Sequence, residues 1–262
     1  MQSNDQEKIR GVVRETYGQV AQGGNGCCTG SNCCDPVVGT GASARLGYSD
    51  TELAAAPEGA DLGLGCGNPQ AIAALQPGET VLDLGSGAGF DCFLAARAVG
   101  ESGRVIGVDM TPEMLSRARE NAHKGDYRNV EFRLGEIEHL PVADDSIDAI
   151  ISNCVINLSP DKEQVFREAF RTLKPGGRLA ISDIVATAKL PEAARQDLAL
   201  YTGCMAGASL IDDLEAMLAS AGFADIRIQP KDESREFIRD WAPGRRVEDY
   251  VVSAGIEAVK LA

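Results

Sequence analysis

The sequence predicts an α/β protein with a doubly wound, mostly parallel, seven-stranded sheet. From Thr80 onward, short runs of β-branched and apolar residues alternate with longer stretches of helical character, as in chains that fold around a parallel sheet. A glycine-rich turn joins the first such run to the first helical stretch, where open α/β sheets bind ligands. With 262 residues, the chain can bury one sizeable core and carry additional segments.

Each element follows from its local pattern. The predicted strands are residues 80–84, 104–109, 130–134, 147–152 and 178–184, with 224–229 and 250–260 completing the sheet edge. The predicted helices are 90–100, 111–124 and 162–177. Thr111 and Pro112 suit the N-cap and first position of the second helix, whereas Pro175 and two glycines close the third.

The chain divides into three predicted segments. Residues 1–68 hold an amphipathic helix at 5–21, which we expect to serve packing, and a Gly- and Cys-rich loop for substrate binding. Residues 69–190 form the ligand-binding core, and 191–262 supply substrate-side helices and the final strands. A loop as long as 22–68 without periodicity is usually functional or disordered.

Charge and composition exclude several function classes. A net charge of −14 would repel a phosphate backbone, so we expect no nucleic-acid partner. No apolar run approaches the roughly 18 residues that span a bilayer, and the polar N-terminus lacks a signal-peptide core. We therefore expect no membrane partner and a cytoplasmic location. In that compartment the eight cysteines favour ligand or redox roles over structural disulfides.

The motif VLDLGSGAGFD places Asp83, Gly85, Gly87 and Gly89 between the first strand and its helix. A tight strand-to-helix turn without a ligand is the alternative interpretation. The dinucleotide-binding fingerprint needs its third glycine one position later, where this chain has Phe90. An acidic Asp83 suits a cationic sulfonium ligand better than a pyrophosphate.

Further cofactor contacts are expected where the next strands end. Asp109 closes the second strand and can accept hydrogen bonds from both ribose hydroxyls, although a turn-capping role is the alternative. Glu136 is predicted for the adenine amino group and Ile137 for the ring face; Met110 and Asn153 complete the set. In order, these motifs resemble the class I S-adenosylmethionine-dependent methyltransferases over about residues 70–190. The resemblance implies a Rossmann-like core with S-adenosylmethionine as cofactor.

The acceptor site is predicted from cysteines. The chain has only two histidines, His123 and His139, and both are expected in solvent, so a general base is not evident. Cys66, Cys154 and Cys204 each stand beside glycine or asparagine in a loop-like setting. Any one of them could be a small buried hydrophobe. Together they favour a thiophilic centre such as trivalent arsenic.

The strings SNCVINLSPDK, LGLGCGNP and YVVSAGIEAVK, with the glycine-flanked Cys204, resemble the arsenite methyltransferase family over nearly the whole chain. The resemblance implies that Cys66, Cys154 and Cys204 bind arsenic(III) or act in redox steps, and that an N-terminal cysteine, here assigned to Cys27, joins them.

The N-terminal segment departs from the family pattern. Where one cysteine would suffice, this chain has pairs at 27–28 and 33–34, which leaves open which of Cys27, Cys28, Cys33 and Cys34 acts. A zinc site built from these four is the structural alternative.

The resemblance also implies the reaction. Thiol-bound arsenite attacks the sulfonium methyl through its lone pair, giving methylated arsenicals in arsenic detoxification. Two cysteines return arsenic to the trivalent state and form a disulfide, which glutathione or thioredoxin reopens. A methyltransferase for a small organic acceptor, of quinone or sterol type, is the enzymatic alternative. A thiol-based metal- or arsenic-binding module without turnover is the non-enzymatic one.

Overall fold

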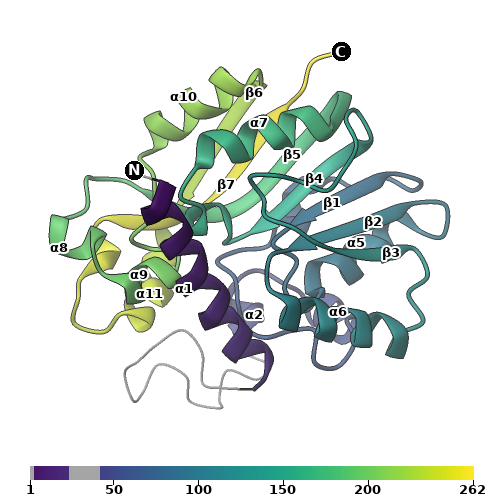
Figure 1. Cartoon of the computed structure of the whole chain (residues 1–262), viewed down its shortest axis with the longest axis horizontal. Helices are drawn as coiled ribbons and strands as arrows, with labels where there is room; N and C mark the ends of the chain where they lie inside the picture. The colour runs from purple at the N-terminus through teal and green to yellow at the C-terminus, as the bar shows by residue number, and fades with distance from the viewer. Residues whose placement is uncertain (1–2, 24–41) are drawn as a thin grey trace.

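A computed structural model describes residues 3–23 and 42–262 and contains the predicted seven-stranded sheet (Figure 1). Its strands are β1 (Thr80–Leu84), β2 (Arg104–Asp109), β3 (Val130–Leu134), β4 (Ile147–Asn153), β5 (Leu173–Ala186), β6 (Ala224–Lys231) and β7 (Val251–Val259). They lie in the order β3-β2-β1-β4-β5-β7-β6. Within the described residues, β7 pairs antiparallel with both β5 and β6, and the other strand pairs are parallel. The predicted fold class is confirmed.

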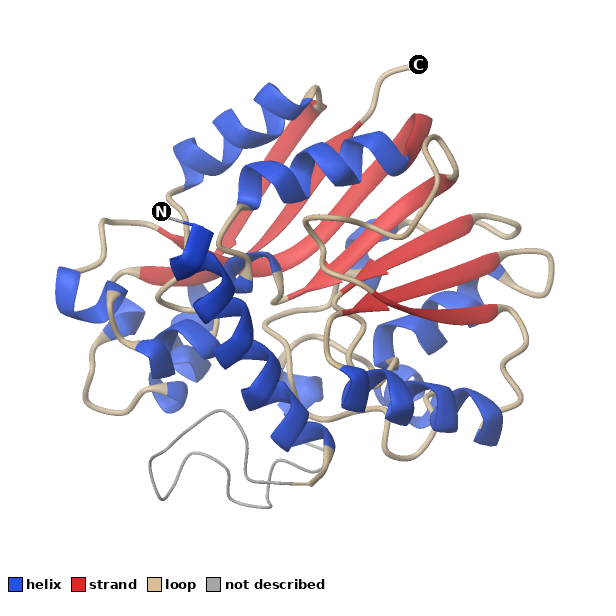
Figure 2. Ribbon diagram, viewed as in Figure 1, coloured by secondary structure: helices blue, strands red, loops and turns tan. Residues whose placement is uncertain are grey.

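Helices cover both faces of the sheet (Figure 2). Side chains alternate between the faces along each strand, which separates two apolar layers. On one face Val81 and Ile151 pack with α5 (Phe90–Val99) and α6 (Pro112–Lys124), near the short α4 (Gln70–Ala73). On the other face Leu82 and Ile150 pack with α7 (Lys162–Thr172) and α10 (Ile211–Ala221). The sheet is therefore the centre of the core.

The third predicted helix ends earlier than expected. We predicted it to run to residue 177, but α7 stops at Thr172 and the segment LKPGG opens β5. The pairing with β4 skips here, from Ile147 opposite Leu173 to Ala149 opposite Arg178. Pro175 and its glycines thus form an irregular strand entry rather than a helix end, because a bulge tolerates a residue without an N–H group.

The N-terminal helix is confirmed as α1 (Ser3–Ala21), followed by α2 (Ala42–Arg45) and α3 (Asp50–Ala55). Figure 1 shows α1 crossing the end of the sheet where the parallel strands finish. It contacts α6 and α9 (Leu198–Thr202), and the Tyr17 hydroxyl donates to the Thr202 carbonyl at 3.0 Å. Of the predicted loop 22–68, residues 24–41, including Cys27, lie outside the described residues, whereas the part from 42 to 68 is not all loop, because it contains α2 and α3.

The segment after β5 supplies the other helices that pack over the end of the sheet. It contains α8 (Glu192–Arg195), α9, α11 (Arg235–Trp241) and the 3₁₀ helices η3 (Asp232–Ser234) and η4 (Val247–Asp249); η2 (Ile156–Leu158) follows β4. Apolar side chains of α1, α9 and α11 pack with the three candidate cysteines in one cluster. Across residues 3–23 and 42–262, no helix has the length and apolar character needed to cross a membrane.

Candidate functional site

A cavity of about 870 Å³ lies where the parallel strands end, beneath α1, α9 and α11. Most of the predicted site residues line it: Asp83, Gly85, Gly87, Asp109, Met110, Ile137, Asn153, Cys154 and Cys204. Gly89, Glu136 and Cys66 are not part of its wall, and Cys27 falls outside the described residues. The glycine turn, Cys154 and Cys204 therefore line one cavity; we call the side of the glycine turn its cofactor end and the side of the cysteines its acceptor end.

The glycine turn exposes backbone to the cavity at Gly87. This residue has a φ of +51°, and a Cβ built on it would meet only the Met114 sulfur, at 4.0 Å. A ligand can approach the main chain there. Gly89 serves packing instead, since it precedes α5 with a φ of +93° and a Cβ would lie 2.8 Å from Phe93 and Phe132. Any direct cofactor contact by Gly89 stays a prediction.

Asp109 both shapes the turn and faces the cavity. Its carboxylate accepts hydrogen bonds from the Gly87 N–H at 3.0 Å and the Thr111 N–H at 2.8 Å. A carboxylate offers about four acceptor positions, so others remain for ribose hydroxyls. The turn role that we weighed as an alternative is therefore compatible with the predicted ligand role. Burial raises the pKa of Asp109.

Two buried carboxylates lie deeper in the same end. Asp83 accepts a hydrogen bond from the Cys92 thiol at 3.2 Å, whereas Asp91 accepts from the Tyr48 hydroxyl at 2.7 Å and the Asn153 amide at 3.3 Å. Burial raises the pKa of Asp83 well above its usual value and that of Asp91 to about 6. Such sites become more stable when a cation approaches. They fit the sulfonium and ammonium groups of S-adenosylmethionine.

Glu136 forms ion pairs with the N-terminal helix α1 and does not line the cavity. It pairs with Arg14 at 3.3 Å and with Arg10 at 3.5 Å, both from α1. Its neighbour Ile137 is buried and lines the cavity, as a residue against an adenine ring should. The adenine contact of Glu136 remains a prediction, and a role in holding α1 stands beside it.

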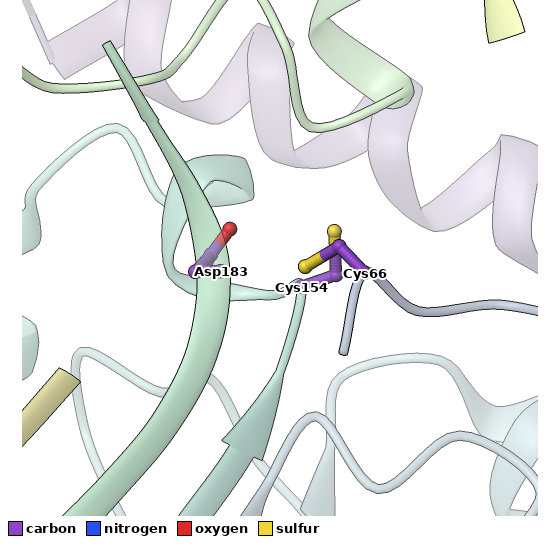
Figure 3. Close-up of side chains that lie close together, drawn as sticks. All are labelled: Cys66, Cys154 and Asp183. Carbon is purple, nitrogen blue, oxygen red and sulfur yellow. The ribbon is translucent and has the colours of Figure 1, made fainter. Parts of the chain in front are cut away.

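The three candidate thiols come together although they are far apart in the sequence. The sulfurs of Cys66 and Cys154 and a carboxylate oxygen of Asp183 all lie within 4.8 Å of one another (Figure 3). The Cys204 thiol donates to the Cys154 carbonyl at 2.7 Å. All three cysteines are buried and unbridged, with Cys66 behind the cavity wall that the other two form. Their loop settings agree with the prediction; their role as ligands is not tested by this geometry.

Cys154 and Cys204 both adopt the left-handed backbone conformation, with φ of +59° and +62°. For residues other than glycine this costs roughly 1–3 kcal/mol each and persists only where the surroundings enforce it. Here the Cys154 N–H donates to the Ser182 carbonyl at 2.8 Å, and the Cys204 carbonyl accepts from the Asn157 side chain at 3.2 Å. The fold therefore holds both thiols in place at a cost in stability.

The thiols are protonated at neutral pH. Burial raises the pKa of Cys66 to about 12. The contact with Cys204 lowers the pKa of Cys154, but Cys66 and burial raise it well above its usual value. The contact with Cys154 and burial raise the pKa of Cys204 well above normal. Any ligand must therefore displace thiol protons.

Four residues of this site were not predicted from the sequence: Tyr48, Asp91, Asn157 and Asp183. One signal was available, because Asp183 interrupts the apolar run LAISDIVA, and a charged residue in a buried strand usually has a specific role. Asp91 and Asn157 lie inside the motifs VLDLGSGAGFD and SNCVINLSPDK, but neither was assigned a role, and nothing local marked Tyr48. The two histidines are exposed, as expected.

Comparison with known proteins agrees with this geometry. Residues 75–222 match the model of a methyltransferase domain family. An arsenite methyltransferase of Halobacterium salinarum is 57% identical over 98% of this chain and 68% of its own length. One from Aquipseudomonas alcaligenes is 44% identical, over 82% of this chain and 62% of its own length, so the chain spans less than two thirds of that relative.

A solved structure shares both fold and sequence. It is an arsenic(III) S-adenosylmethionine methyltransferase from Chlamydomonas reinhardtii, with a TM-score of 0.62 and 36% identity over 84% of this chain and 73% of that one. With the cavity, the glycine turn and the gathered thiols, these likenesses show that the chain belongs to the arsenite methyltransferase family.

Proposed function

We propose that this chain transfers a methyl group from S-adenosylmethionine to trivalent arsenic bound by Cys66, Cys154 and Cys204. The observation that carries the proposal is that Cys154 and Cys204 line a cavity that also fits the cofactor, while the Cys66 sulfur lies within 4.8 Å of the Cys154 sulfur. Family membership supports the same reaction.

Charge favours arsenic as the occupant of the thiol group. Arsenite is the neutral As(OH)₃ at neutral pH. Each thiol forms an As–S bond while its proton leaves with a hydroxide as water, so three thiols give a neutral centre. Zinc(II) bound by three thiolates would leave a net negative charge beside the buried Asp183, which a desolvated site disfavours. The raised thiol pKa values are therefore compatible with arsenic.

The chain's own task at the cofactor end is orientation. Gly87, Asp109 and Asp91 would hold S-adenosylmethionine, which supplies an electrophilic methyl group. The cysteines would hold arsenic with its lone pair toward that methyl, and such alignment can supply much of the rate enhancement. An organic acceptor of quinone or sterol type would not need the three thiols. A binding module without turnover would not need the cofactor end.

A thiol cycle extends the proposal. Methyl transfer formally oxidises arsenic, so two cysteines must supply electrons to return it to the trivalent state, and they become a disulfide. Cys66 and Cys154 are a suitable pair, because their sulfurs lie within 4.8 Å. Glutathione or thioredoxin would then reduce this disulfide. Cys27 is a further partner for this step, in a segment outside the described residues.

The direct test uses the whole chain with arsenite, glutathione and S-adenosylmethionine carrying an isotopic methyl label. Mass spectrometry should find the label in methylated arsenicals. Retained arsenite binding without labelled product would support the binding module instead. Label transferred only to a quinone or sterol offered in parallel would support the organic acceptor.

A further inference from the structure

A buried carboxylate stands beside the thiols. Asp183 lies near the end of β5 and is 2% exposed. One of its oxygens lies within 4.8 Å of both the Cys66 and the Cys154 sulfur (Figure 3). An arsenic atom bonded to these two sulfurs would therefore have this carboxylate close by.

The hydrogen bonds of Asp183 suit an ionised carboxylate. It accepts from the Ile156 N–H at 2.9 Å, the Asn157 side-chain amide at 2.9 Å and the Ile184 N–H at 2.7 Å. Among the described residues it forms no direct ion pair; the nearby Lys162 donates instead to the Gly207 carbonyl. Burial raises the pKa of Asp183 to about 6, while the Ile184 N–H and the charge of Lys162 lower it. Three hydrogen-bond donors thus favour the negatively charged form of this side chain, and no cation among the described residues is in contact with it.

We propose that Asp183 stabilises the positive charge that arises on arsenic during methyl transfer. This inference rests on the proposed function. In the transfer, the arsenic lone pair forms the As–C bond while the C–S bond breaks and its electron pair returns to the sulfonium sulfur. Arsenic goes from the trivalent to the pentavalent state, and one positive charge moves from sulfur to arsenic.

The two ends of the cavity therefore need different counter-ions at different times. Before transfer the positive charge would lie on the cofactor, at the end of the cavity that Asp83 and Asp91 line. After transfer it lies on arsenic, where Asp183 is the carboxylate within 4.8 Å of the ligand sulfurs. The neutral thiol-bound arsenic of the ground state gains little from that carboxylate, whereas the transition state gains much. An interaction of this kind raises the rate of transfer without tightening arsenite binding.

The competing explanation is that Asp183 only positions the loops that carry the thiols. Substitution of Asn157 distinguishes this positioning role from the electrostatic role. The Asn157 amide donates to Asp183, to the Ile184 carbonyl at 2.6 Å and to the Cys204 carbonyl at 3.2 Å, so it ties together the loops that carry the thiols. Asn157→Ala removes these ties and leaves the charge of Asp183. Asp183→Asn removes the charge and keeps a side chain of nearly the same shape.

The test compares arsenite affinity with the single-turnover rate of methyl transfer. Equilibrium dialysis with arsenic quantified by mass spectrometry gives the affinity. For Asp183→Asn we expect arsenite Kd within about twofold of the parent, and transfer slower by roughly 100- to 1,000-fold, the scale of losing one well-placed stabilising group. Asn157→Ala should weaken arsenite binding. A transfer rate for Asp183→Asn within twofold of the parent would overturn the proposal, as would equal losses in affinity and rate.

In Asp183→Asn the new NH₂ group can face the backbone N–H groups of Ile156 and Ile184, which would destabilise the fold. Asp183→Ser is therefore the second variant, because serine also removes the charge and leaves room for a water molecule beside those N–H groups. Either variant, if it folds, tests whether the charge of Asp183 raises the rate of methyl transfer. Measurements on the parent protein distinguish a failure of the proposed function from a failure of the proposed role of Asp183. If it binds arsenite but never methylates it, the proposed function fails; if it methylates arsenite and the neutral variants are equally fast, only the role of Asp183 fails.

Discussion

The two ends of the cavity are built in different ways. The cofactor end comes mainly from one continuous stretch, residues 83–91, completed by residues 109–111, Ile137 and Asn153 at or after the ends of neighbouring strands. The acceptor end is assembled from four separate segments: 65–67, 153–157, 182–184 and 203–207. A local motif can be recognised from the sequence alone, whereas the acceptor end exists only once the sheet has formed.

The cofactor end and the acceptor end of the cavity also differ in charge. Carboxylates dominate the cofactor end, while the acceptor end presents three buried thiols that are protonated at neutral pH. Substitutions and pH should therefore affect cofactor and arsenite separately. The predictions below test that separation.

The largest expected effect is the loss of Cys154. Arsenite offers three positions to thiols, whereas monomethylated arsenic has one filled by carbon and needs two. Cys154 and Cys204 line the cavity and contact each other, so we expect them to serve both substrates. Cys154→Ser should abolish methylation of both, and Cys66→Ser should abolish only that of arsenite. Product analysis with excess thiol reductant measures this.

Cys92→Ser is the matched control, because Cys92 is also a buried thiol but contacts Asp83 at the cofactor end. It should leave arsenite binding intact. If Cys154→Ser still methylates either arsenical, Cys154 is not a ligand and the two ends are not divided as described.

Asp109→Ala should weaken cofactor binding by about 1.5–3 kcal/mol, the range for hydrogen bonds to a charged group. Part of the loss comes from the turn, since Asp109 also holds the Gly87 N–H. Asp109→Asn keeps one acceptor and should lose less. Calorimetry measures both variants, with arsenite binding expected to persist. Unchanged cofactor affinity in the alanine variant would remove Asp109 from the site.

Acid should weaken cofactor binding more than arsenite binding. The pKa of Asp91 is raised to about 6, so its carboxylate is ionised above that pH and attracts the cationic cofactor. As the pH falls through about 6 it becomes protonated, and Kd for the cofactor should rise by up to roughly tenfold, the effect of about one pKa unit. Exchange of As–OH for neutral thiols takes up or releases no proton, so arsenite affinity should stay nearly constant. Asp91→Asn should flatten the cofactor profile. Parallel changes for both ligands would contradict the separation.

Much of the fold followed from the sequence because strand and helix periodicities are local. The first three strands, 80–84, 104–109 and 130–134, have the predicted bounds. The LKPGG segment was misassigned because proline and glycine close helices and form bulges alike, and only pairing with β4 distinguishes them. Asn157 lies inside the motif SNCVINLSPDK, but its role, like that of Tyr48, depends on a partner far away in the sequence: Cys204 for Asn157 and Asp91 for Tyr48.

The smallest expected effect decides between two roles of Glu136. Its pair with Arg14 is partly exposed, with 31% and 38% of the side chains accessible, and such pairs contribute only about 0–1 kcal/mol. If Glu136 only anchors α1, Glu136→Ala and Arg14→Ala should weaken cofactor binding to the same small extent, because both loosen the helix that covers the cavity. If Glu136 accepts a hydrogen bond from the adenine amino group, Glu136→Ala should weaken binding by about 0.5–1.5 kcal/mol, less than for Asp109 because the Glu136 side chain is 31% exposed and water competes for the bond. Arg14→Ala should then leave it unchanged or tighten it, because a competing partner is removed. Cofactor titrations of both variants and the double variant settle the question: equal losses that do not add would show that the predicted adenine contact is wrong.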